Sequence, residues 1–450
     1  MFAQTKAVRK GVKGSTRQIA AESGLGGVRV AAMAFPPPPN ELALGRTEQS
    51  LADLFPLDRS YCFLNHGSFG SVPHEVLATQ QAIRMEIEAR PIEMLDRRLR
   101  ANLSAARARV AQFVGTEPER LGFVVNATEG VNAFLRSLRW ERGDEVIVVD
   151  QVYNAMRQSL LRLTREFGIG LRIVEVGLPV PTPSAWIDAV ESAFTPRTRM
   201  LLIDHITSPT ALVLPVVELV RRARARGVRT LVDGAHAPGS IALSIDAIGA
   251  DAYTANLHKW VCAPKGCAFL AVSSEHATEV HPLATSHFFG EGYTREFDWQ
   301  GTRDVSSWLA APAAIDFFER FGWERVRARN HSLACWAQRF LCARWSVEPI
   351  SPLDGSMLAS MAAVWLPPRV QAMFGSAVEL QAHLYAAHRI EIPVIDWKGR
   401  WHVRVSCHLH TNPALIEQLA EAILGLGARQ CPAPAAVDCR ATAGAPTKSA

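Results

Sequence analysis

A lysine and an aspartate are the residues whose types and surroundings most directly suggest covalent chemistry. Lys259 lies in the stretch YTANLHKWVCAPKGC, between a histidine and a tryptophan. Asp233 lies earlier, at the end of the apolar run RTLVD and before Gly-Ala-His236. An activated lysine amine attacks carbonyl groups, and a carboxylate at the carboxyl end of a parallel strand points toward the crevice where α/β sheets bind ligands. These residue types predict a site in which an amine and an acid hold one small molecule.

A third feature is the stretch GFVVNATEGVNAFLRSL, which reads as strand, turn and helix. Its apolar residues recur at helical spacing to bury one face, namely Val131, Phe134, Leu135 and Leu138. The free N–H groups at the start of that helix, with the Thr128 hydroxyl beside them, suit a phosphate. Capping of the helix by Asn126 or Thr128 is compatible with that role. Neither GxGxxG nor GxxxxGK[ST] is present, so a Rossmann dinucleotide site or a P-loop is not supported.

An amine, a strand-end carboxylate and an anion site are the three features that pyridoxal 5'-phosphate requires. The amine forms a Schiff base with its aldehyde, the carboxylate keeps the pyridine nitrogen protonated, and the anion site holds the phosphate. The alternatives are a solvated surface lysine and an aspartate that only caps a turn.

The elements that must position these residues alternate along the chain. From about 120 to 275, short apolar runs are separated by helical patterns, which predicts an α/β domain with a largely parallel sheet covered on both faces. The expected strands are GFVV, DEVIVVD, LRIVEV, MLLIDH, RTLVDG, DAYTAN and GCAFLAV. The run MLLIDHITSPT brings Asp204, His205, Thr207 and Ser208 to the same sheet edge as Asp233 if the strands are neighbours. PHEVLATQQAIRMEIEAR predicts a helix that leads into this domain, and WLAAPAAIDFFERF begins a second region with strands such as MAAVWL and HVRVSC.

We expect five segments in the chain. They are a disordered extension over 1–45, an N-terminal segment over 50–85 that packs with the small domain, a large cofactor-binding domain over 86–305, a small α+β domain over 306–430, and a disordered tail over 431–450. A targeting peptide and a translation start placed too early are the other interpretations of the first segment.

Composition excludes several classes of protein. The chain has 450 residues with 48% hydrophobic content and a net charge of +5 from 48 basic and 43 acidic residues, mostly scattered, so a nucleic-acid partner is not expected. No apolar run reaches the roughly 18 residues of a membrane span. The eight cysteines lack CxxC spacing, which favours reduced thiols in a cytoplasmic protein without a zinc site. They are Cys62, Cys262, Cys267, Cys335, Cys342, Cys407, Cys431 and Cys439.

A family resemblance rests on LVDGAHAPG followed by TANLHKWVCAPKG. Together they resemble the signature of class V aminotransferases, within the fold type I pyridoxal-phosphate enzymes, with Lys259 at the Schiff-base position. The resemblance covers roughly residues 55 to 425. It implies a three-layer αβα large domain with a mainly parallel mixed sheet, followed by the smaller α+β domain.

The resemblance also implies the residues that contact the cofactor. Asp233 would pair with the pyridine nitrogen, and His236 would lie near the phenolic oxygen. The Ala127 backbone, Thr128, Asn256 and His258 would surround the phosphate.

Further positions match the family around the ring and at a subunit interface. Tyr153 occupies the position of a ring that stacks on the cofactor, and Thr207 or Ser208 would approach the phenolic oxygen. GTRD at 301–304 resembles the segment that reaches the phosphate of a neighbouring subunit, so Thr302, with Arg303, would act in trans within a homodimer.

The substrate side rests on two matches. Arg404, in HVRVSCHLHTN, would form a bidentate pair with a substrate α-carboxylate, and a structural salt bridge is the alternative. YCFLNHGSFGSVPHEV resembles the entrance segment of isopenicillin N epimerase-like members, so Asn65 and His66 would approach an amino-acid-like substrate.

Several reactions stay open at the level of sequence. Lys259 is the natural base for the Cα proton, and loss of that proton leads to epimerisation, transamination or β-elimination. A carbon–sulfur lyase or a cysteine desulfurase-like enzyme is therefore the alternative to an epimerase or aminotransferase. Desulfuration requires a thiolate on a mobile loop, and residues 380–400 hold no cysteine, while Cys407 lies within a strand. A non-catalytic binding protein of this fold is the alternative of another class; it has no chemical need for Lys259, Asp233 and Arg404 together.

Overall fold

A seven-stranded mixed sheet forms the centre of the large region. The computed structural model describes residue 44 and residues 46–426, so the expectations for the chain's ends lie outside the described residues, apart from Leu44. The strands are β2 (Leu121–Val124), β3 (Glu145–Val149), β4 (Gly170–Val174), β5 (Thr198–Asp204), β6 (Arg229–Asp233), β7 (Ala252–Asn256) and β8 (Ala268–Val272). Their order is β2-β8-β7-β6-β5-β3-β4, and only β8 pairs in antiparallel fashion, with β7 and β2. All seven expected strands are confirmed, and the mainly parallel order follows from their continuous apolar runs.

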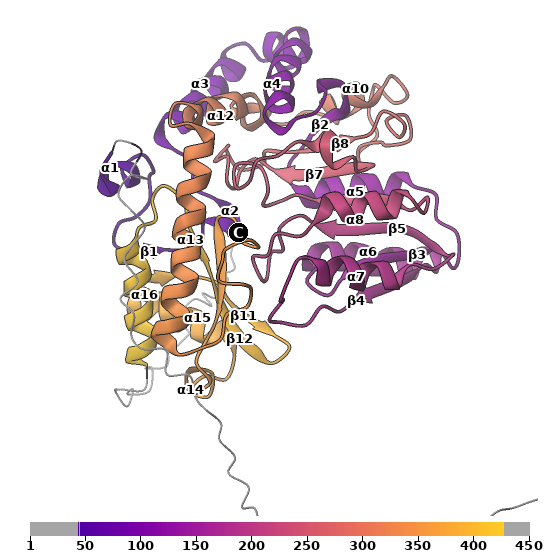
Figure 1. Cartoon of the computed structure of the whole chain (residues 1–450). Helices are drawn as coiled ribbons and strands as arrows, with labels where there is room; N and C mark the ends of the chain where they lie inside the picture. The colour runs from indigo at the N-terminus through magenta and orange to yellow at the C-terminus, as the bar shows by residue number, and fades with distance from the viewer. Residues whose placement is uncertain (1–43, 45, 427–450) are drawn as a thin grey trace, which may run out of the picture. The chain divides into compact units, whose positions relative to one another are not determined.

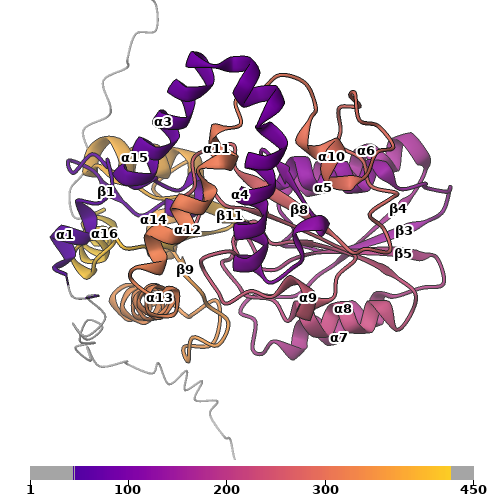
Figure 2. The ribbon, with the colours of Figure 1, turned by 90° about the horizontal axis from the view of Figure 1, so that it is seen from above.

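Helices cover both faces of this sheet and give three layers (Figures 1 and 2). One face carries α5 (Ala127–Ser137), α6 (Asn154–Phe167) and α10 (Tyr293–Asp298), which share an apolar core with the sheet. The other carries α4 (Leu99–Val114), α7 (Ser184–Ala193), α8 (Val216–Arg224) and α9 (Ile245–Ile248) over a second core. The sheet is therefore buried on both faces. We expect ligands to bind at the carboxyl ends of its parallel strands.

The predicted helices around the first part of the chain are also present. The predicted leading helix is α3 (His74–Ala89), preceded by α1 (Glu48–Ala52) and the short α2 (His66–Phe69), and η2 (Glu93–Arg97) joins it to α4. The 3-10 turn η3 (Pro118–Arg120) leads into β2. Helices α3 and α4 pack against α11 (Ser306–Leu309) and α12 (Ala311–Glu319), which include most of the stretch WLAAPAAIDFFERF.

The C-terminal region is a smaller α+β layer. Strands β9 (Met361–Trp365), β11 (Val394–Trp397) and β12 (Arg400–Ser406) form an antiparallel sheet in the order β11-β12-β9. Its core is shared with α13 (Trp323–Trp345), α15 (Ala377–His388) and α16 (Pro413–Gly425), while α14 (Pro368–Gln371) follows β9. The short β1 (Cys62–Phe63) pairs with β10 (Ile390–Glu391), so the N-terminal segment joins this region.

A close approach between α5 and β7 sets the position of the predicted anion site. Gly130 lies on the face of α5 that meets Thr254 of β7, and a Cβ at position 130 would come within 2.2 Å of the Thr254 hydroxyl. Only glycine permits that approach. The start of α5 is thereby held beside the carboxyl end of β7.

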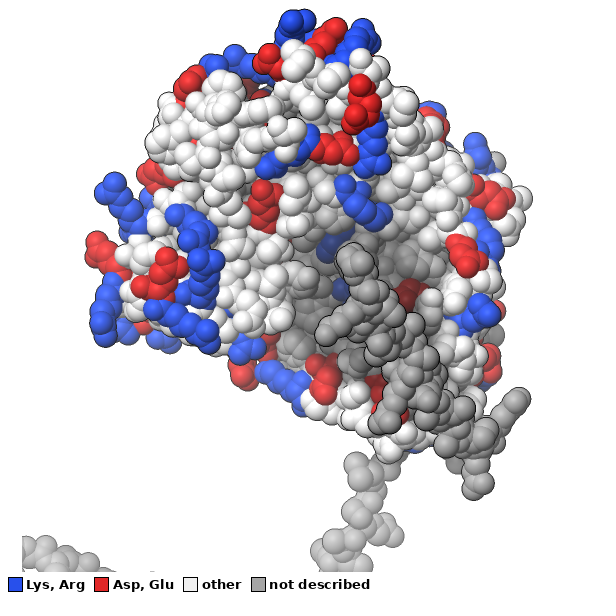
Figure 3. Space-filling view, turned by 180° about the vertical axis from the view of Figure 1, so that it is seen from behind, with Lys and Arg blue, Asp and Glu red and all other residues white. Residues whose placement is uncertain are grey.

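The surface and the helices agree with the composition. Basic and acidic side chains are interspersed over the face shown in Figure 3, as the near balance of 48 to 43 suggests. Within the described residues, no helix combines the length and the apolar character of a membrane span. The cytoplasmic location stays a prediction.

Candidate active site

A cavity of about 310 Å³ opens at the carboxyl ends of the parallel strands, at the lower end of the range for small-molecule sites. It lies beside β3, which has β4 on one side and β5 on the other. Because the chain continues to opposite sides of β3, this is the topological switch point of the sheet. Its lining consists of Ser68, Phe69, Val125, Asn126, Ala127, Thr128, Tyr153, Met156, Asp204, Ser208, Asp233, Ala235, His236, Asn256, His258, Lys259 and Gly266. Nine of the predicted site residues thus come together in one cavity.

Lys259 presents its amine to this cavity next to His236. The Lys259 Nζ atom lies 3.1 Å from Nε2 of His236. Burial lowers the pKa of Lys259 to about 7, helped by the positive charge of Arg404 and opposed by Asp233 and Asp204. The amine is therefore available as a nucleophile or base near neutral pH, which a solvated lysine is not.

Two carboxyl groups lie side by side in the cavity. Asp233 and Asp204 end β6 and β5 and are partners in the register of these strands. Asp233 accepts the Ala235 N–H at 2.9 Å through Oδ1, while the Oδ2 atoms of both aspartates are buried without a partner among the described residues. Burial raises the pKa of both groups, and the charge of Asp233 raises that of Asp204 further. An unsatisfied buried acceptor needs a donor, and a protonated pyridine nitrogen is one.

The start of α5 forms the predicted anion site, except that the Ala127 N–H is not free to bind an anion. Asn126 caps the helix by accepting the Glu129 N–H at 2.9 Å. The Ala127 N–H donates to Oδ1 of Asn256 at 2.9 Å, so it is already engaged, and Asn256 orients the turn. Within the described residues this leaves the Thr128 N–H and hydroxyl as the donors of the first turn that face the cavity.

Histidine and serine side chains complete the lining. His258 lines the cavity and places its Nδ1 atom 3.2 Å from the Cys267 carbonyl, and burial lowers its pKa to about 4. Tyr153, at the start of α6, lines the cavity with 44% of its surface exposed. Of the two residues expected near the phenolic oxygen, Ser208 lines the cavity, whereas Thr207 is fully buried and bonds to Thr210 at 2.7 Å.

Arg404 comes to the site from the C-terminal region. On β12, its Nη1 donates to the Ser208 carbonyl at 2.5 Å and to the Ser208 hydroxyl at 3.1 Å, and its Nη2 to Ser68 Oγ at 3.3 Å. Its Nε is buried without a partner among the described residues. Burial lowers its pKa to about 10, so the guanidinium remains charged at neutral pH. Arg404 thus lies behind two lining residues with donor capacity to spare, and no acidic side chain takes it in a salt bridge among the described residues.

The entrance segment contributes other residues than those predicted. Asn65 and His66 are not among the lining residues: Asn65 donates to Glu391 at 2.9 Å, and His66 is fully buried. The one-turn helix α2 instead directs Ser68 and Phe69 at the cavity, with Phe69 73% exposed. Sequence reasoning missed both because the resemblance singles out Asn65 and His66, although the matched motif also contains Ser68 and Phe69; their position one helical turn after Asn65 was the only signal.

Thr302 and Arg303 do not line the cavity of their own chain. Thr302 is exposed and outside the lining, and Arg303 lies over the Trp308 ring at 5.3 Å. Their role in a neighbouring subunit stays a prediction.

Asp204 is expected at this sheet edge from its place after an apolar run, and its contact with the cavity adds it to the candidate residues.

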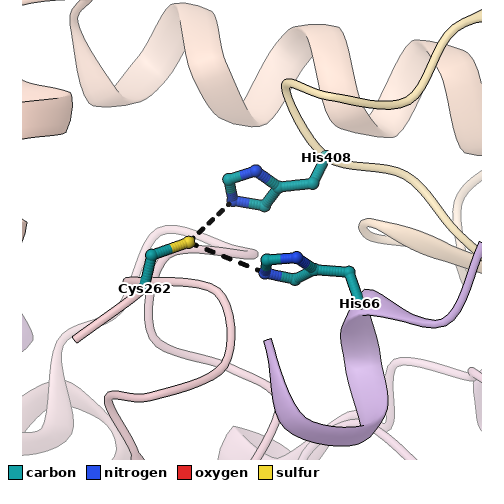
Figure 4. Close-up of side chains that lie close together, drawn as sticks. All are labelled: His66, Cys262 and His408. Atoms are coloured by element: carbon teal, nitrogen blue, oxygen red, sulfur yellow. Dashed lines mark hydrogen bonds between the residues drawn. The ribbon is translucent and has the colours of Figure 1, made fainter. Parts of the chain in front are cut away.

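Cys262, which follows Lys259 by three residues, meets His66 and His408 (Figure 4). The Sγ atom lies 3.6 Å from Nε2 of each histidine, distances that a tetrahedral metal would tolerate. The two imidazoles, however, are stacked, with ring centroids 4.2 Å apart and planes 18° apart. Ring nitrogens bind a metal in the plane of the ring, and stacked parallel rings cannot both direct their Nε2 lone pairs at one ion. The cluster therefore packs the loop and does not form a metal site in this arrangement.

The residues present fit pyridoxal phosphate. The unpartnered Asp233 Oδ2 suits the ring nitrogen, the first turn of α5 suits the phosphate, and the Lys259 amine suits the aldehyde. When bound, the cofactor supplies an aldehyde carbon and an electron-accepting ring. The fold and the site define a pyridoxal-phosphate enzyme of fold type I.

Comparison with known proteins gives the family. Residues 64–382 match the family model Aminotransferase class-V. The chain is 34% identical to isopenicillin N epimerase of Amycolatopsis lactamdurans, over 82% of this chain and 95% of the relative. It is 31% identical to a probable chloroplastic L-cysteine desulfhydrase of Arabidopsis thaliana, over 82% and 83% of the two chains. The chain belongs to the class V aminotransferase family, and it is a pyridoxal-phosphate-dependent enzyme.

Solved structures agree on the fold. The apo structure of cysteine desulfurase from Thermococcus onnurineus NA1 superimposes with a TM-score of 0.71 at 18% identity, covering 85% of this chain and 98% of that one. A cystine C–S lyase in complex with its product cysteine persulfide gives a TM-score of 0.68 at 20% identity, covering 81% of this chain and 97% of that one. The predicted three-layer large domain and smaller α+β region are confirmed.

Proposed function

We propose that this enzyme removes the α-proton of an α-amino carboxylate from one face of Cα and adds a solvent-derived proton to the opposite face, which gives the epimer. The observation that carries the proposal is the Lys259 amine, which lies in a cavity that also holds Asp233 and is backed by Arg404. Lys259 carries the cofactor and then moves the Cα proton, and Arg404 binds the substrate carboxylate. Ser68 and Ser208 orient Arg404, and Phe69 at the cavity lining contacts the substrate side chain. Support for epimerisation comes from the identity to isopenicillin N epimerase along nearly its whole length.

Hydrogen exchange at Cα tests the proposal. The purified enzyme is incubated in D₂O with a panel of L-amino acids and short peptides that carry a free α-amino carboxylate. We expect deuterium at Cα together with inversion for at least one compound, detected by NMR and chiral chromatography. Lys259→Ala is the control and removes the exchange. Absence of exchange with every compound in the panel, by an enzyme that carries its cofactor, would contradict the proposal.

A carbon–sulfur lyase is the second candidate, favoured by the placement of the thiols. The six free cysteines of the described chain are all buried, none lines the cavity, and burial raises the pKa of each. A desulfurase needs a thiolate to accept sulfur, whereas elimination from cysteine needs only a leaving thiol at Cβ and releases sulfide, pyruvate and ammonia with uptake of water. Sulfide and pyruvate in equal amounts from cysteine, without Cα inversion, would select the lyase.

We also propose a homodimer in which Thr302 reaches the neighbouring site. Thr302 is exposed and lies outside the cavity lining of its own chain, as a residue that acts in trans would. Light scattering of the purified protein gives the mass. Mixing Lys259→Ala with Thr302→Ala chains should restore one intact site in each mixed dimer if the threonine acts in trans.

A further inference from the structure

Trp260 and Lys259 each contact one of the two ring nitrogens of His236. The indole Nε1–H of Trp260 donates to Nδ1 of His236 at 3.3 Å. The other nitrogen, Nε2, lies 3.1 Å from Nζ of Lys259. Trp260 and His236 are buried, with 1% and 2% of their surface exposed. Consecutive side chains of one loop therefore engage opposite edges of one imidazole.

The chemistry of the two contacts fixes where the protons lie. An indole N–H is a donor only, so Nδ1 of His236 must present its lone pair, and a neutral imidazole then carries its proton on Nε2. An Nε2–H that faces an ammonium group would set two donors against each other at 3.1 Å. The contact is a hydrogen bond only when the Lys259 nitrogen offers a lone pair.

We infer that Trp260 is a positioning residue, whose indole N–H fixes the Nε2–H tautomer of His236 and through it holds Lys259 as a neutral amine. This inference deepens the proposed function, because it rests on Lys259 as the reactive amine. A neutral amine has the lone pair that attack on an aldehyde requires.

The charged groups around Lys259 and His236 explain why a hydrogen bond from Trp260 affects the protonation of both. Asp233 and Asp204 favour the ammonium form of Lys259, while burial and Arg404 oppose it. His236 is faced by Lys259, Arg404 and His258, and its burial lowers its pKa well below 6.5. An imidazolium would place a second N–H against the Trp260 indole, so the bond from Trp260 acts in the same direction as burial.

The two histidines drawn in Figure 4 contact the backbone carbonyl groups of Lys259 and Trp260. Nε2 of His66 lies 3.0 Å from the Lys259 carbonyl, and Nε2 of His408 lies 3.4 Å from the Trp260 carbonyl. His410 places its Nε2 3.0 Å from Nδ1 of His66, which leaves the Nε2–H of His66 for the carbonyl. Gly239 allows close contact from a third side, since a Cβ there would come within 2.7 Å of the Trp260 carbonyl oxygen. The indole is thus fixed relative to His236 by several independent contacts.

The test is made on the unloaded protein, without cofactor or substrate. Nitrogen-15 NMR of histidine-labelled protein identifies the tautomer of His236, and the His236→Phe spectrum assigns its signals. We expect a protonated Nε2 and a bare Nδ1 in the wild type. A protonated Nδ1 or an imidazolium near neutral pH would overturn the inference, and this measurement needs no Trp260 variant.

The reactivity of the amine provides the second readout. The rate at which an acylating reagent modifies Lys259, followed by peptide mass spectrometry across pH, gives the pKa of the amine. Trp260→Phe and His236→Phe should both raise that pKa and lower the rate near neutral pH about threefold to tenfold, a shift of roughly half a unit to one unit. Trp308→Phe is the matched control, because its buried indole donates to the Gly266 carbonyl at 2.9 Å and not to His236.

The outcomes separate the inference from the proposed function. An unchanged pKa of Lys259 in a folded Trp260→Phe or His236→Phe protein would overturn the role of Trp260. If Trp260→Phe does not fold, the wild-type tautomer and the His236→Phe rates decide. Failure to find an amino acid that turns over would contradict the proposed function alone, since neither readout uses cofactor or substrate.

Discussion

Asp204 and Asp233 are register partners at the carboxyl ends of β5 and β6, and both line the cavity that holds Lys259. Each keeps one buried oxygen without a partner among the described residues. Two carboxylates this close in a dry site do not ionise independently. Burial raises the pKa of both groups, and the charge of Asp233 raises the pKa of Asp204 further, so Asp233 holds its charge more readily than Asp204.

The first prediction separates these two acids. Asp233→Asn removes the charge that a protonated ring nitrogen needs, so cofactor affinity should fall about tenfold to a hundredfold, the value of one hydrogen bond to a charged group. Asp204→Asn should weaken binding less, because that carboxyl is the more easily protonated one. Equilibrium dialysis with pyridoxal phosphate measures both. Equal losses in the two variants would contradict the assignment of the ring nitrogen to Asp233.

The second prediction concerns Arg404. Arg404→Lys keeps the charge but loses the planar fork, so affinity for an amino-acid substrate should fall about tenfold or more, while the cofactor still binds. The readout is the change in cofactor absorbance on titration with an amino acid. Arg400→Lys is the matched control in β12, because Arg400 pairs with Glu348 at 2.5 Å and lies 4.2 Å from the Trp365 ring centroid, away from the cavity lining. A purely structural Arg404 would leave the titration unchanged in the folded variant.

The third prediction is a pH dependence. The pKa of Lys259 is lowered from 10.5 to about 7, so the neutral amine should increase about tenfold per pH unit below that value and level off above it. The rate of cofactor attachment, trapped by borohydride and measured by mass spectrometry, should follow this curve. Lys398 is the internal comparison, since Asp150 and Glu175 raise its pKa. A Lys259 rate that still rises steeply well above neutral pH would exclude the lowered pKa.

The fourth prediction concerns the packing of α5. Gly130→Ala places a methyl group against Thr254, so the free energy of unfolding should fall by about 1–3 kcal/mol. The helix start should shift as well, with weaker binding of inorganic phosphate to the unloaded protein. Gly425→Ala, a helical position with open space around the new methyl group, should be neutral or stabilising by up to about 1 kcal/mol. Chemical denaturation compares the two.

The fifth prediction addresses Cys407. The thiol is fully buried, burial raises its pKa, and it does not line the cavity. Cys407→Ala should therefore lower stability by about 1 kcal/mol and leave turnover within about twofold of the wild type. Complete loss of sulfur release from cysteine in a folded variant would revive the desulfurase alternative.

Much of the site could be read from the sequence because local patterns fix strand ends and helix starts. The apolar run RTLVD predicts a buried strand, so Asp233 must lie at its carboxyl end, and the helical spacing after Asn126 places Thr128 in a first turn. The family signature then identified Lys259. These predictions hold because they depend on residues close together in the chain.

Long-range packing decided what the sequence could not. Whether Ser208 or Thr207 faces the cavity depends on how the loop after β5 folds back on itself, through the bond between Thr207 and Thr210. Nothing local in the entrance motif tells that His66 turns inward to the Lys259 carbonyl while Phe69 faces the cavity. The sequence by itself determined the chemistry, because residue types set what an amine, an acid and a helix start can do. Only the tertiary structure decided which side chains share the cavity and which protons they hold, because those depend on contacts between segments far apart in the chain, such as β12 and the loop after β5.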